Sequence, residues 1–266
     1  MRGFSAEWLA LREPADRDAR LQAGQVTRAV LETLPTDRLV EVVDLGCGTG
    51  SNVRFLSERL GSQVRWRLLD HDAALLAHAA RLAGPHVETR VVDLRQLAVV
   101  DLGDADLVTA SALLDLVSDA WLATFVRACR DRDAAVLVAL NYDGRIACAP
   151  ADDDDAFVRT LVNRHQRTDK GFGPALGPDA GARAAERLAA AGYRVTSAKS
   201  DWEIGPDRGE LQRQLIAGWA EAAIELEPGA RGRIEAWRTR RTQHVDAGDS
   251  HLTVGHDDVG ATLVDR

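Results

Sequence analysis

The sequence predicts an α/β domain in which a mostly parallel sheet is covered by helices on both faces. Short β-branched apolar runs alternate with segments of helical periodicity between residues 39 and 140. The first apolar run ends in a glycine cluster, as a buried parallel strand often does. The composition, 45% hydrophobic and 28% charged, is that of an ordinary globular protein. Alternating strands and helices imply right-handed crossovers and therefore a parallel sheet.

The N-terminal segment is expected to be helical. Ala23, Val26, Val30 and Leu34 recur at helical spacing, and Pro35 closes the run. Five strands should follow, at residues 39–45, 63–70, 86–93, 105–111 and 134–140. Helices are expected between them, after the glycine cluster, at residues 73–82 and at residues 121–130.

The alternation stops after residue 140. Residues 142–178 mix glycine and proline with charged residues, so we expect a long insertion with one short helix near residues 155–164. A helix and a strand are expected within residues 181–199, two helices at 210–226 and 230–245, and a final strand within 251–264. We expect one domain over residues 1–266, divided into an N-terminal helical segment (1–37), a cofactor-binding half (38–141), a substrate insertion (142–178) and a C-terminal half with inserted helices (179–266).

Charge and cysteine content favour a cytoplasmic protein with a small-molecule partner. The net charge of -8 disfavours nucleic acid as a ligand. No segment approaches the roughly 20 apolar residues of a membrane span, and the N-terminus lacks the apolar run of a secretory signal. Cys47, Cys129 and Cys148 form no CxxC pair, which is typical of reduced thiols. The sequence does not indicate an oligomeric state.

The strongest chemical signal is the turn from Asp44 to Gly50, DLGCGTG, which joins the first strand to the next helix. Glycines at such a turn let a ligand approach the backbone at the helix N-terminus. The spacing departs from the GxGxxG of a dinucleotide site, because Ser51 stands where the third glycine belongs. The Asp44 carboxylate would repel a pyrophosphate and attract a cationic sulfonium and ammonium.

Residues 42–52, VVDLGCGTGSN, resemble the first motif of the class I S-adenosylmethionine-dependent methyltransferases. The resemblance extends over residues 38–141. It implies a Rossmann-like fold with a seven-stranded, mostly parallel sheet whose last strand is antiparallel, and helices inserted near the C-terminus. It also implies S-adenosylmethionine as the cofactor.

By this resemblance, the glycine loop lies against the methionine and ribose portions of the cofactor, and acids at three successive strand ends complete the site. Asp70, followed by His71, matches the ribose-binding acid. Asp93 matches the acid that accepts from the adenine amino group, with the Leu94 backbone N–H beside the ring, and Ser111 borders the methionine group. The cofactor-binding residues implied are Asp44, Gly46, Cys47, Gly48, Asn52, Asp70, His71, Asp93, Leu94 and Ser111. One acid at a strand end is more often a cap, but three in register favour a ligand site.

Substrate residues are expected from the N-terminal helices and the insertion, because both can fold across the carboxyl edge of the sheet. The candidates are Arg12, Tyr142, Asp143, Arg145, Arg164 and Lys170. His165 and Tyr142 are candidates for a catalytic base. The alternative is a solvated helix face for the charged residues and a structural role for the histidine. The four acids at 152–155 favour a charged helix N-terminus over a metal site, so no metal is expected.

These observations favour a transferase that methylates a small metabolite, with an anionic group suggested by the basic residues 164–170. The segment after the fourth strand, SALLDLVS, lacks the Asn-Pro-Pro-Tyr type motif of enzymes that methylate amide or base nitrogens. Two alternatives stay open: an enzyme that uses S-adenosylmethionine for a non-methyl transfer or displacement, and a non-catalytic cofactor-binding or regulatory protein. An RNA methyltransferase is a more distant alternative.

Overall fold

Eight strands form one sheet in the computed structural model, which describes residues 5–82, 86–99 and 102–263. The strands are β1 (Val40–Leu45), β2 (Val64–Asp70), β3 (Val87–Val91), β4 (Leu107–Ser111), β5 (Ala135–Ala149), β6 (Tyr193–Lys199), β7 (Trp202–Ile204) and β8 (His251–Leu263). The described α-helices are α1 (Ala6–Gln22), α2 (Gly24–Leu31), α3 (Ser51–Leu60), α4 (Ala73–Leu82), α5 (Asp119–Arg130), α6 (Asp155–Gln166), α7 (Ala180–Ala190), α8 (Gly209–Leu226) and α9 (Arg231–Ala247).

The strand order is β3-β2-β1-β4-β5-β8-β6, with β7 paired to β8 outside this path. Strands β1 to β5 pair in parallel, whereas β8 runs antiparallel to both β5 and β6. The prediction of a mostly parallel sheet with an antiparallel last strand is therefore confirmed. The short strand β7 is an eighth strand that the sequence pattern did not predict, and it pairs with β8 near Val254.

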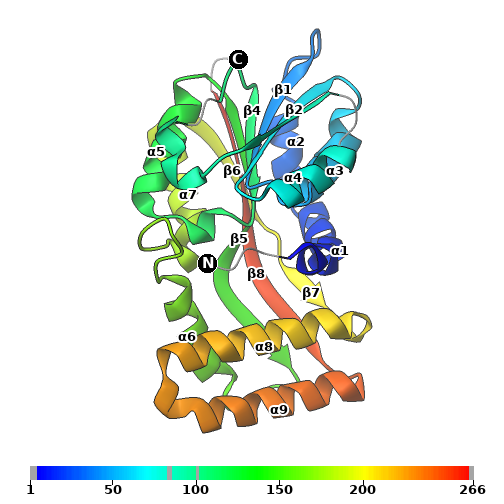
Figure 1. The fold of residues 1–266 in the computed structure, drawn as a ribbon, viewed down its shortest axis with the longest axis vertical. Coiled ribbons are helices and arrows are strands. Elements are labelled where there is room, and N and C mark those ends of the chain that lie inside the picture. Colours follow the sequence, from blue (N-terminus) through cyan, green and yellow to red (C-terminus); the bar gives the residue numbers. More distant parts are fainter. Residues whose placement is uncertain (1–4, 83–85, 100–101, 264–266) are drawn as a thin grey trace.

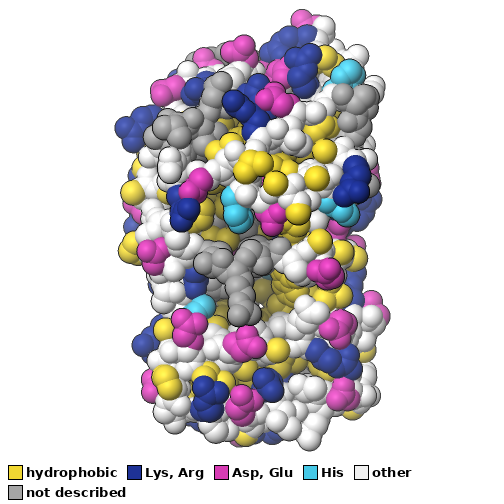
Figure 2. Space-filling model, viewed as in Figure 1, with side chains coloured by type: hydrophobic (Ala, Val, Ile, Leu, Met, Phe, Trp, Pro, Cys, Tyr) yellow, Lys and Arg dark blue, Asp and Glu magenta, His cyan; other side chains and the backbone are white. Residues whose placement is uncertain are grey.

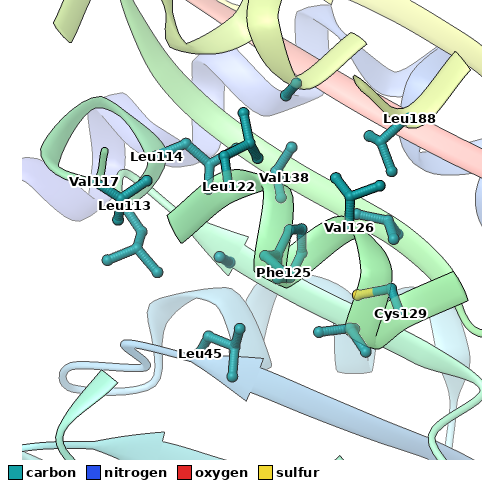
Figure 3. Close-up of a cluster of buried hydrophobic side chains, with 14 of the residues drawn as sticks. Leu45, Leu113, Leu114, Val117, Leu122, Phe125, Val126, Cys129, Val138 and Leu188 are labelled. Atoms are coloured by element: carbon teal, nitrogen blue, oxygen red, sulfur yellow. The ribbon is translucent and has the colours of Figure 1, made fainter. Parts of the chain in front are cut away.

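Alternate residues of the sheet serve two hydrophobic cores, one on each face (Figure 1). Val42 faces the core shared with α2, α3 and α4, while the next residue, Val43, faces the core shared with α5 and α7. Figure 3 shows the second of these cores, in which Phe125 and Val126 of α5 lie against Val138 of the sheet. Helices thus cover both faces, as the continuous apolar strands predicted.

A glycine in β8 lets α2 lie directly on the sheet. A Cβ atom at Gly260 would lie 2.7 Å from Cγ2 of Val30 and 3.0 Å from Cγ1 of Val26. Both valines are fully buried. Any side chain at this position would push α2 outward and loosen the core beneath it.

The sequence pattern predicted that the fifth strand ends at residue 140, but β5 continues to Ala149. Its pairing with β8 shifts register between Val138 and Asn141, and Leu140 there has a positive φ of 55°. This bulge changes which face the side chains occupy, so the apolar alternation stops although the strand continues. The residues that looked like the start of an insertion are therefore part of the sheet.

The extensions of β5 and β8 carry a third core with α6, α8 and α9, at the lower end of the molecule in Figure 1. Trp219 of α8 and Trp237 of α9 are buried in it. The acids before α6 hold α9 in place: Asp152 accepts a hydrogen bond from Nε of Arg240 at 2.6 Å, and Trp237 Nε1 donates to Asp155 at 2.8 Å. These acids thus join two helices of the third core.

No described helix combines the length and apolar character needed to cross a bilayer. On the face drawn in Figure 2, basic and acidic side chains are intermixed, with hydrophobic side chains scattered among them.

Candidate functional site

A cavity of about 440 Å³ lies at the carboxyl ends of β1, β2 and β4, where α1 and residues 170–172 also border it. Its position is the edge at which open parallel sheets bind ligands. All ten residues that the sequence assigned to cofactor binding line it: Asp44, Gly46, Cys47, Gly48, Asn52, Asp70, His71, Asp93, Leu94 and Ser111. The structure therefore brings residues from four strand ends into one space.

The glycine turn after β1 presents backbone atoms to the cavity, because Gly46 and Gly48 have no side chains. Gly46 and Gly48 have φ angles of 66° and 52°, in the left-handed region that favours glycine. The Gly46 N–H donates to the Leu69 carbonyl at 2.8 Å, which ties the turn to the end of β2. Helix α1 closes over the turn, because a Cβ atom at Gly48 would lie 3.1 Å from Cδ1 of Leu9.

Asp44 is fully buried at the base of the cavity and belongs to a polar network. Asn52 Nδ2 donates to Asp44 Oδ1 at 2.7 Å and to Thr109 Oγ1 at 3.0 Å, while Arg20 Nη1 donates to Asn52 Oδ1 at 2.7 Å. Burial raises the pKa of Asp44 to about 7, and the nearby Asp70 adds to this effect. Asn52 therefore orients Asp44, and Oδ2 of Asp44 has no hydrogen-bond partner in the described residues.

Asp70, at the end of β2, has its carboxylate aimed at the glycine turn. Its Oδ2 accepts from the Gly48 N–H at 2.8 Å, and its Oδ1 accepts from the Asp72 N–H at 3.0 Å. His71 Nδ1 lies 3.1 Å from Oδ1, and the His71 side chain is largely exposed. A carboxylate has about four lone-pair positions, so Asp70 can still accept from a neighbouring hydroxyl group.

The third acid, Asp93, already forms an ion pair with Arg95. Arg95 donates from Nε to Asp93 Oδ1 at 2.8 Å and from Nη2 to Asp93 Oδ2 at 2.6 Å, and this fork lowers the pKa of Asp93. Beside it, the buried Leu94 is held by Trp121, whose Nε1 donates to the Leu94 carbonyl at 2.6 Å. A ligand that hydrogen-bonds to Asp93 would have to share it with Arg95.

The α1 side of the cavity carries an ion pair between Arg12 and Asp16. Arg12 Nε donates to Asp16 Oδ2 at 2.9 Å, and the Arg12 guanidinium carbon lies 5.2 Å from the ring centre of Trp202. Trp202 Nε1 donates to the same carboxylate at 3.1 Å. Helix α1 is thus fastened to β7, and Arg12 is oriented from two sides.

Lys170 lines the opposite wall, and His165 lies behind it. Lys170 Nζ is 3.0 Å from Thr168 Oγ1 and 3.2 Å from His165 Nδ1, while His165 Nε2 is 3.2 Å from Oε2 of the exposed Glu225. With Lys170 donating to Nδ1, the histidine carries its proton on Nε2. His165 is not among the residues that line the cavity, so its contact with the cavity runs through Lys170.

The remaining substrate candidates lie outside the lining of the cavity. Tyr142 is buried and donates to Asn163 Oδ1 at 2.7 Å, and burial raises its pKa. Asp143 accepts from Nε of Arg145 at 2.7 Å on the extension of β5. Arg164 is exposed on α6. Tyr142, Asp143 and Arg145 lie within the extension of β5, which carries them away from the sheet edge.

The structure adds residues that sequence reasoning did not select. Those lining the cavity are Leu9, Asp16, Thr49, Ser51, Leu75, Arg95, Ala112, Leu113, Leu116, Gly171 and Phe172. Ala112 has a positive φ of 52° at the turn that ends β4, and Leu113 and Leu116, which follow it, line the cavity. For Ala112, Leu113 and Leu116, the signal available in the sequence was their position directly after the fourth strand.

Comparisons with known proteins agree with this geometry. Residues 42–132 match the family model described as a methyltransferase domain. A curated relative, trans-aconitate 2-methyltransferase of Azoarcus sp. (strain BH72), is 37% identical over 95 residues, which is 36% of this chain and 36% of the relative. The match therefore spans about a third of each protein.

Two solved structures share the fold. A cyclopropane-fatty-acyl-phospholipid synthase-like protein from Lactobacillus casei ATCC 334 superposes with a TM-score of 0.59 and 15% identity, covering 98% of this chain and 95% of the other. Geranyl diphosphate C-methyltransferase from Streptomyces coelicolor A3(2) superposes with a TM-score of 0.50 and 15% identity, covering 92% and 78%.

Proposed function

We propose that this chain, which carries a class I methyltransferase domain, transfers the methyl group of S-adenosylmethionine to a small acceptor that bears an anionic group. The observation that carries the proposal is the convergence of the ten predicted cofactor residues on one cavity at the sheet edge. The family model covers all ten of these positions, since all lie within residues 42–132.

The residues of the cavity fit a sulfonium nucleoside. Oδ2 of Asp44 is buried without a hydrogen-bond partner among the described residues, and such an atom gains most from a cationic ligand. Asp70 adds a second negative charge beside the turn. A Cβ atom at Gly46 would point toward Leu113 and Leu94, so the absence of a side chain there keeps the cavity open.

Positioning is the main contribution that this chain can make to the reaction. When bound, S-adenosylmethionine supplies a methyl group activated by its sulfonium, and holding an acceptor in line with that group can lower the barrier by about 7 to 11 kcal/mol. Asp44 would hold the cationic end of the cofactor and Asp70 its ribose hydroxyl groups, and the apolar side chains of Leu9, Leu113 and Leu116 would exclude water from the space beside it.

The basic side chains that line the cavity favour an anionic acceptor. Arg12 and Arg95 line the cavity but are each paired with a neighbouring acid, Asp16 and Asp93 respectively. Lys170 instead hydrogen-bonds to neutral groups, so its positive charge is available to a ligand. The name of the curated relative gives trans-aconitate as its acceptor, which makes that compound the first acceptor to test.

The test has two stages, binding and turnover. Calorimetry should show that the chain binds S-adenosylmethionine and S-adenosylhomocysteine, and that Asp70→Ala weakens binding about 5- to 150-fold, as expected for a loss of about 1 to 3 kcal/mol. The matched control is Asp119→Ala, at an exposed acid that pairs with Arg187 outside the cavity. Equal affinities of Asp70→Ala and the unaltered chain would contradict the assignment.

Turnover is measured with methyl-labelled S-adenosylmethionine and a panel of small carboxylates that begins with trans-aconitate. The proposal expects labelled product and S-adenosylhomocysteine in equal amounts. Consumption of the cofactor without S-adenosylhomocysteine would favour a non-methyl transfer or displacement. Weak or undetectable cofactor binding would favour a non-catalytic role.

We further propose that residues 1–266 act as one methyltransferase unit in the cytoplasm. β5 and β8 run through both the cofactor-binding part and the third core, which argues for a single unit. Cys47, Cys129 and Cys148 are free thiols, which fits a reducing compartment. Limited proteolysis that released a stable fragment ending near residue 141 would argue against the single unit.

A further inference from the structure

A buried arginine stands behind the acid at the base of the cavity. Arg20, in the last turn of α1, is 2% exposed and is not among the residues that line the cavity. Its Nη1 donates to Asn52 Oδ1 at 2.7 Å, and Asn52 Nδ2 donates in turn to Asp44 Oδ1 at 2.7 Å. Asn52 and Asp44 both line the cavity. Two hydrogen bonds in series therefore join a buried cation of α1 to a carboxylate of the cavity.

The surroundings of Arg20 hold its side chain in place and favour its charged form. Its guanidinium carbon lies 3.9 Å from the ring centre of Phe55 in α3, and the face of an aromatic ring attracts a cation. Burial lowers the pKa of Arg20, but arginine stays charged in proteins. Three carboxylates favour this charge, those of Asp258 in β8, Asp44 in β1 and Asp16 in α1.

Asp44 needs a counter-charge because it is fully buried. Burial raises the pKa of Asp44 to about 7, and the negative charge of Asp70 adds to this effect. The hydrogen bond from Asn52 and the positive charge of Arg20 act in the opposite direction. The ionised form of Asp44 near neutral pH therefore depends on these two neighbours.

The other titratable groups described near this network do not supply the charge that Asp44 needs. Asp70 is itself an acid, and burial keeps Cys47 a neutral thiol because it raises the pKa of that group. Arg59 acts on Arg20, whose positive charge it disfavours. The counter-charge of Asp44 is therefore Arg20.

We propose that Arg20 is a positioning residue of the cofactor site, which holds the Asp44 carboxylate oriented and ionised through Asn52, so that the cavity attracts a cationic cofactor near neutral pH. This inference rests on the proposed methyltransferase function and adds to it a residue outside the lining of the cavity. It also connects α1, which closes over the glycine turn, to the charge of the site.

The test compares Arg20→Met with the unaltered chain by calorimetric titration with S-adenosylmethionine at pH 7 and pH 9. Loss of the arginine should raise the pKa of Asp44 by about one pH unit, the lower end of the effect of a nearby opposite charge, because Asn52 lies between the two groups. The ionised fraction at pH 7 then falls from about one half to about one tenth, which weakens binding about fivefold.

At pH 9 Asp44 is largely ionised in both proteins, so the two affinities should agree within about twofold. The ratio of the two affinities is the measured quantity, because titration of the cofactor's own amino group affects both proteins alike. Arg20→Lys retains the positive charge and should weaken binding at pH 7 less than Arg20→Met does. If Arg20→Met does not fold, the neutral but polar Arg20→Gln takes its place, with the same expected ratios.

Two controls separate charge from structure. Arg17→Met makes the same substitution on α1, where Arg17 pairs with Glu58 of α3 at 2.8 Å outside the cavity, and should bind like the unaltered chain at both pH values. Adenosine lacks the sulfonium and the ammonium of the cofactor. Its affinity ratio between Arg20→Met and the unaltered chain should not change with pH.

A ratio for S-adenosylmethionine that is the same at pH 7 and pH 9 would overturn the inference, since a purely structural role would act equally at both. A pH-dependent ratio with adenosine, or with Arg17→Met, would overturn it as well, because the effect would then not come from the ligand's charge or from Arg20. The proposed methyltransferase function fails separately, if the unaltered chain binds S-adenosylmethionine at neither pH.

Discussion

The pH dependence of unfolding, measured without any ligand, tests the environment of Asp115, a buried acid in the turn Leu114–Leu116 after β4. Burial raises the pKa of its carboxyl group to about 6, against an ordinary value near 3.9. Arg12 and Lys170 act in the opposite direction, and the buried Tyr142 also interacts with Asp115. The perturbation is Asp115→Asn, which removes the titration while preserving the shape of the side chain.

The sign of the effect follows from proton binding. Between pH 4 and pH 6 the folded chain keeps a proton on Asp115 that the unfolded chain has released, so the free energy of unfolding falls as pH rises. A difference of about two pKa units corresponds to about 3 kcal/mol. This stability is fully present below pH 4 and is lost as pH rises through 6.

Asp115→Asn lacks this loss. Relative to the unaltered chain, the variant should therefore gain about 3 kcal/mol in the free energy of unfolding between pH 4 and pH 7. The amide group introduced in the variant is unpaired, which changes its free energy of unfolding by the same amount at every pH. This constant change does not affect how the free energy of unfolding depends on pH. The sign of the gain is the diagnostic quantity, because an acid stabilised by ion pairs would produce the reverse.

The assay is urea unfolding at half-unit steps from pH 4 to pH 7.5, without cofactor, with the slope against urea held common to both proteins. Asp119→Asn is the control, because Arg187 lowers the pKa of Asp119 and its removal should act in the opposite direction. Parallel stability curves for Asp115→Asn and the unaltered chain would refute the reasoning, as would a variant that gains stability toward low pH.

Three further substitutions test the geometry around the cavity. Gly50→Ala should lower the free energy of unfolding by about 1 to 3 kcal/mol in urea titrations, because Gly50 has a φ of 81° and a Cβ atom there would lie 3.1 Å from that of Ala79. Asn52→Ala should weaken S-adenosylmethionine binding at least tenfold by calorimetry, since it removes the 2.7 Å bond that orients Asp44; unchanged affinity would show that the network is only structural. Trp121→Phe should lower the free energy of unfolding by about 1 to 2 kcal/mol, because a buried carbonyl loses its donor.

The sequence predicted ten of the residues that line the cavity because these residues obey local rules. Asp44, Asp70 and Ser111 each stand at the end of a predicted strand, and parallel strands bring their carboxyl ends to one edge. The position of a residue in its own element was enough to predict where it lies. Contacts that depend on a neighbour were not predictable in this way, as the fork between Arg95 and Asp93 shows.

The acceptor end depends on backbone irregularities that leave weak traces in sequence. Tyr142 was expected at the sheet edge because the apolar run ends at Leu140, yet β5 bulges there and continues. The N–H of Leu140 is held by Asp258 Oδ1 at 2.8 Å, a partner more than a hundred residues away. A single pattern cannot distinguish the end of a strand from a bulge that a distant side chain stabilises.

The same reasoning explains why Lys170 lines the cavity and His165, the candidate base, does not. Both belong to one basic group, and histidine is the more common proton acceptor near neutral pH. The fold instead directs Lys170 into the cavity and places His165 between it and the exposed Glu225. Because the acceptor wall is assembled from α1, the turn after β4 and residues 170–172, only tertiary contacts such as that of Trp202 with Asp16 determine which charges face the ligand. The proposed acceptor side of the cavity is therefore built from segments distant in sequence, whereas the proposed cofactor residues lie at strand ends that a short motif already identifies.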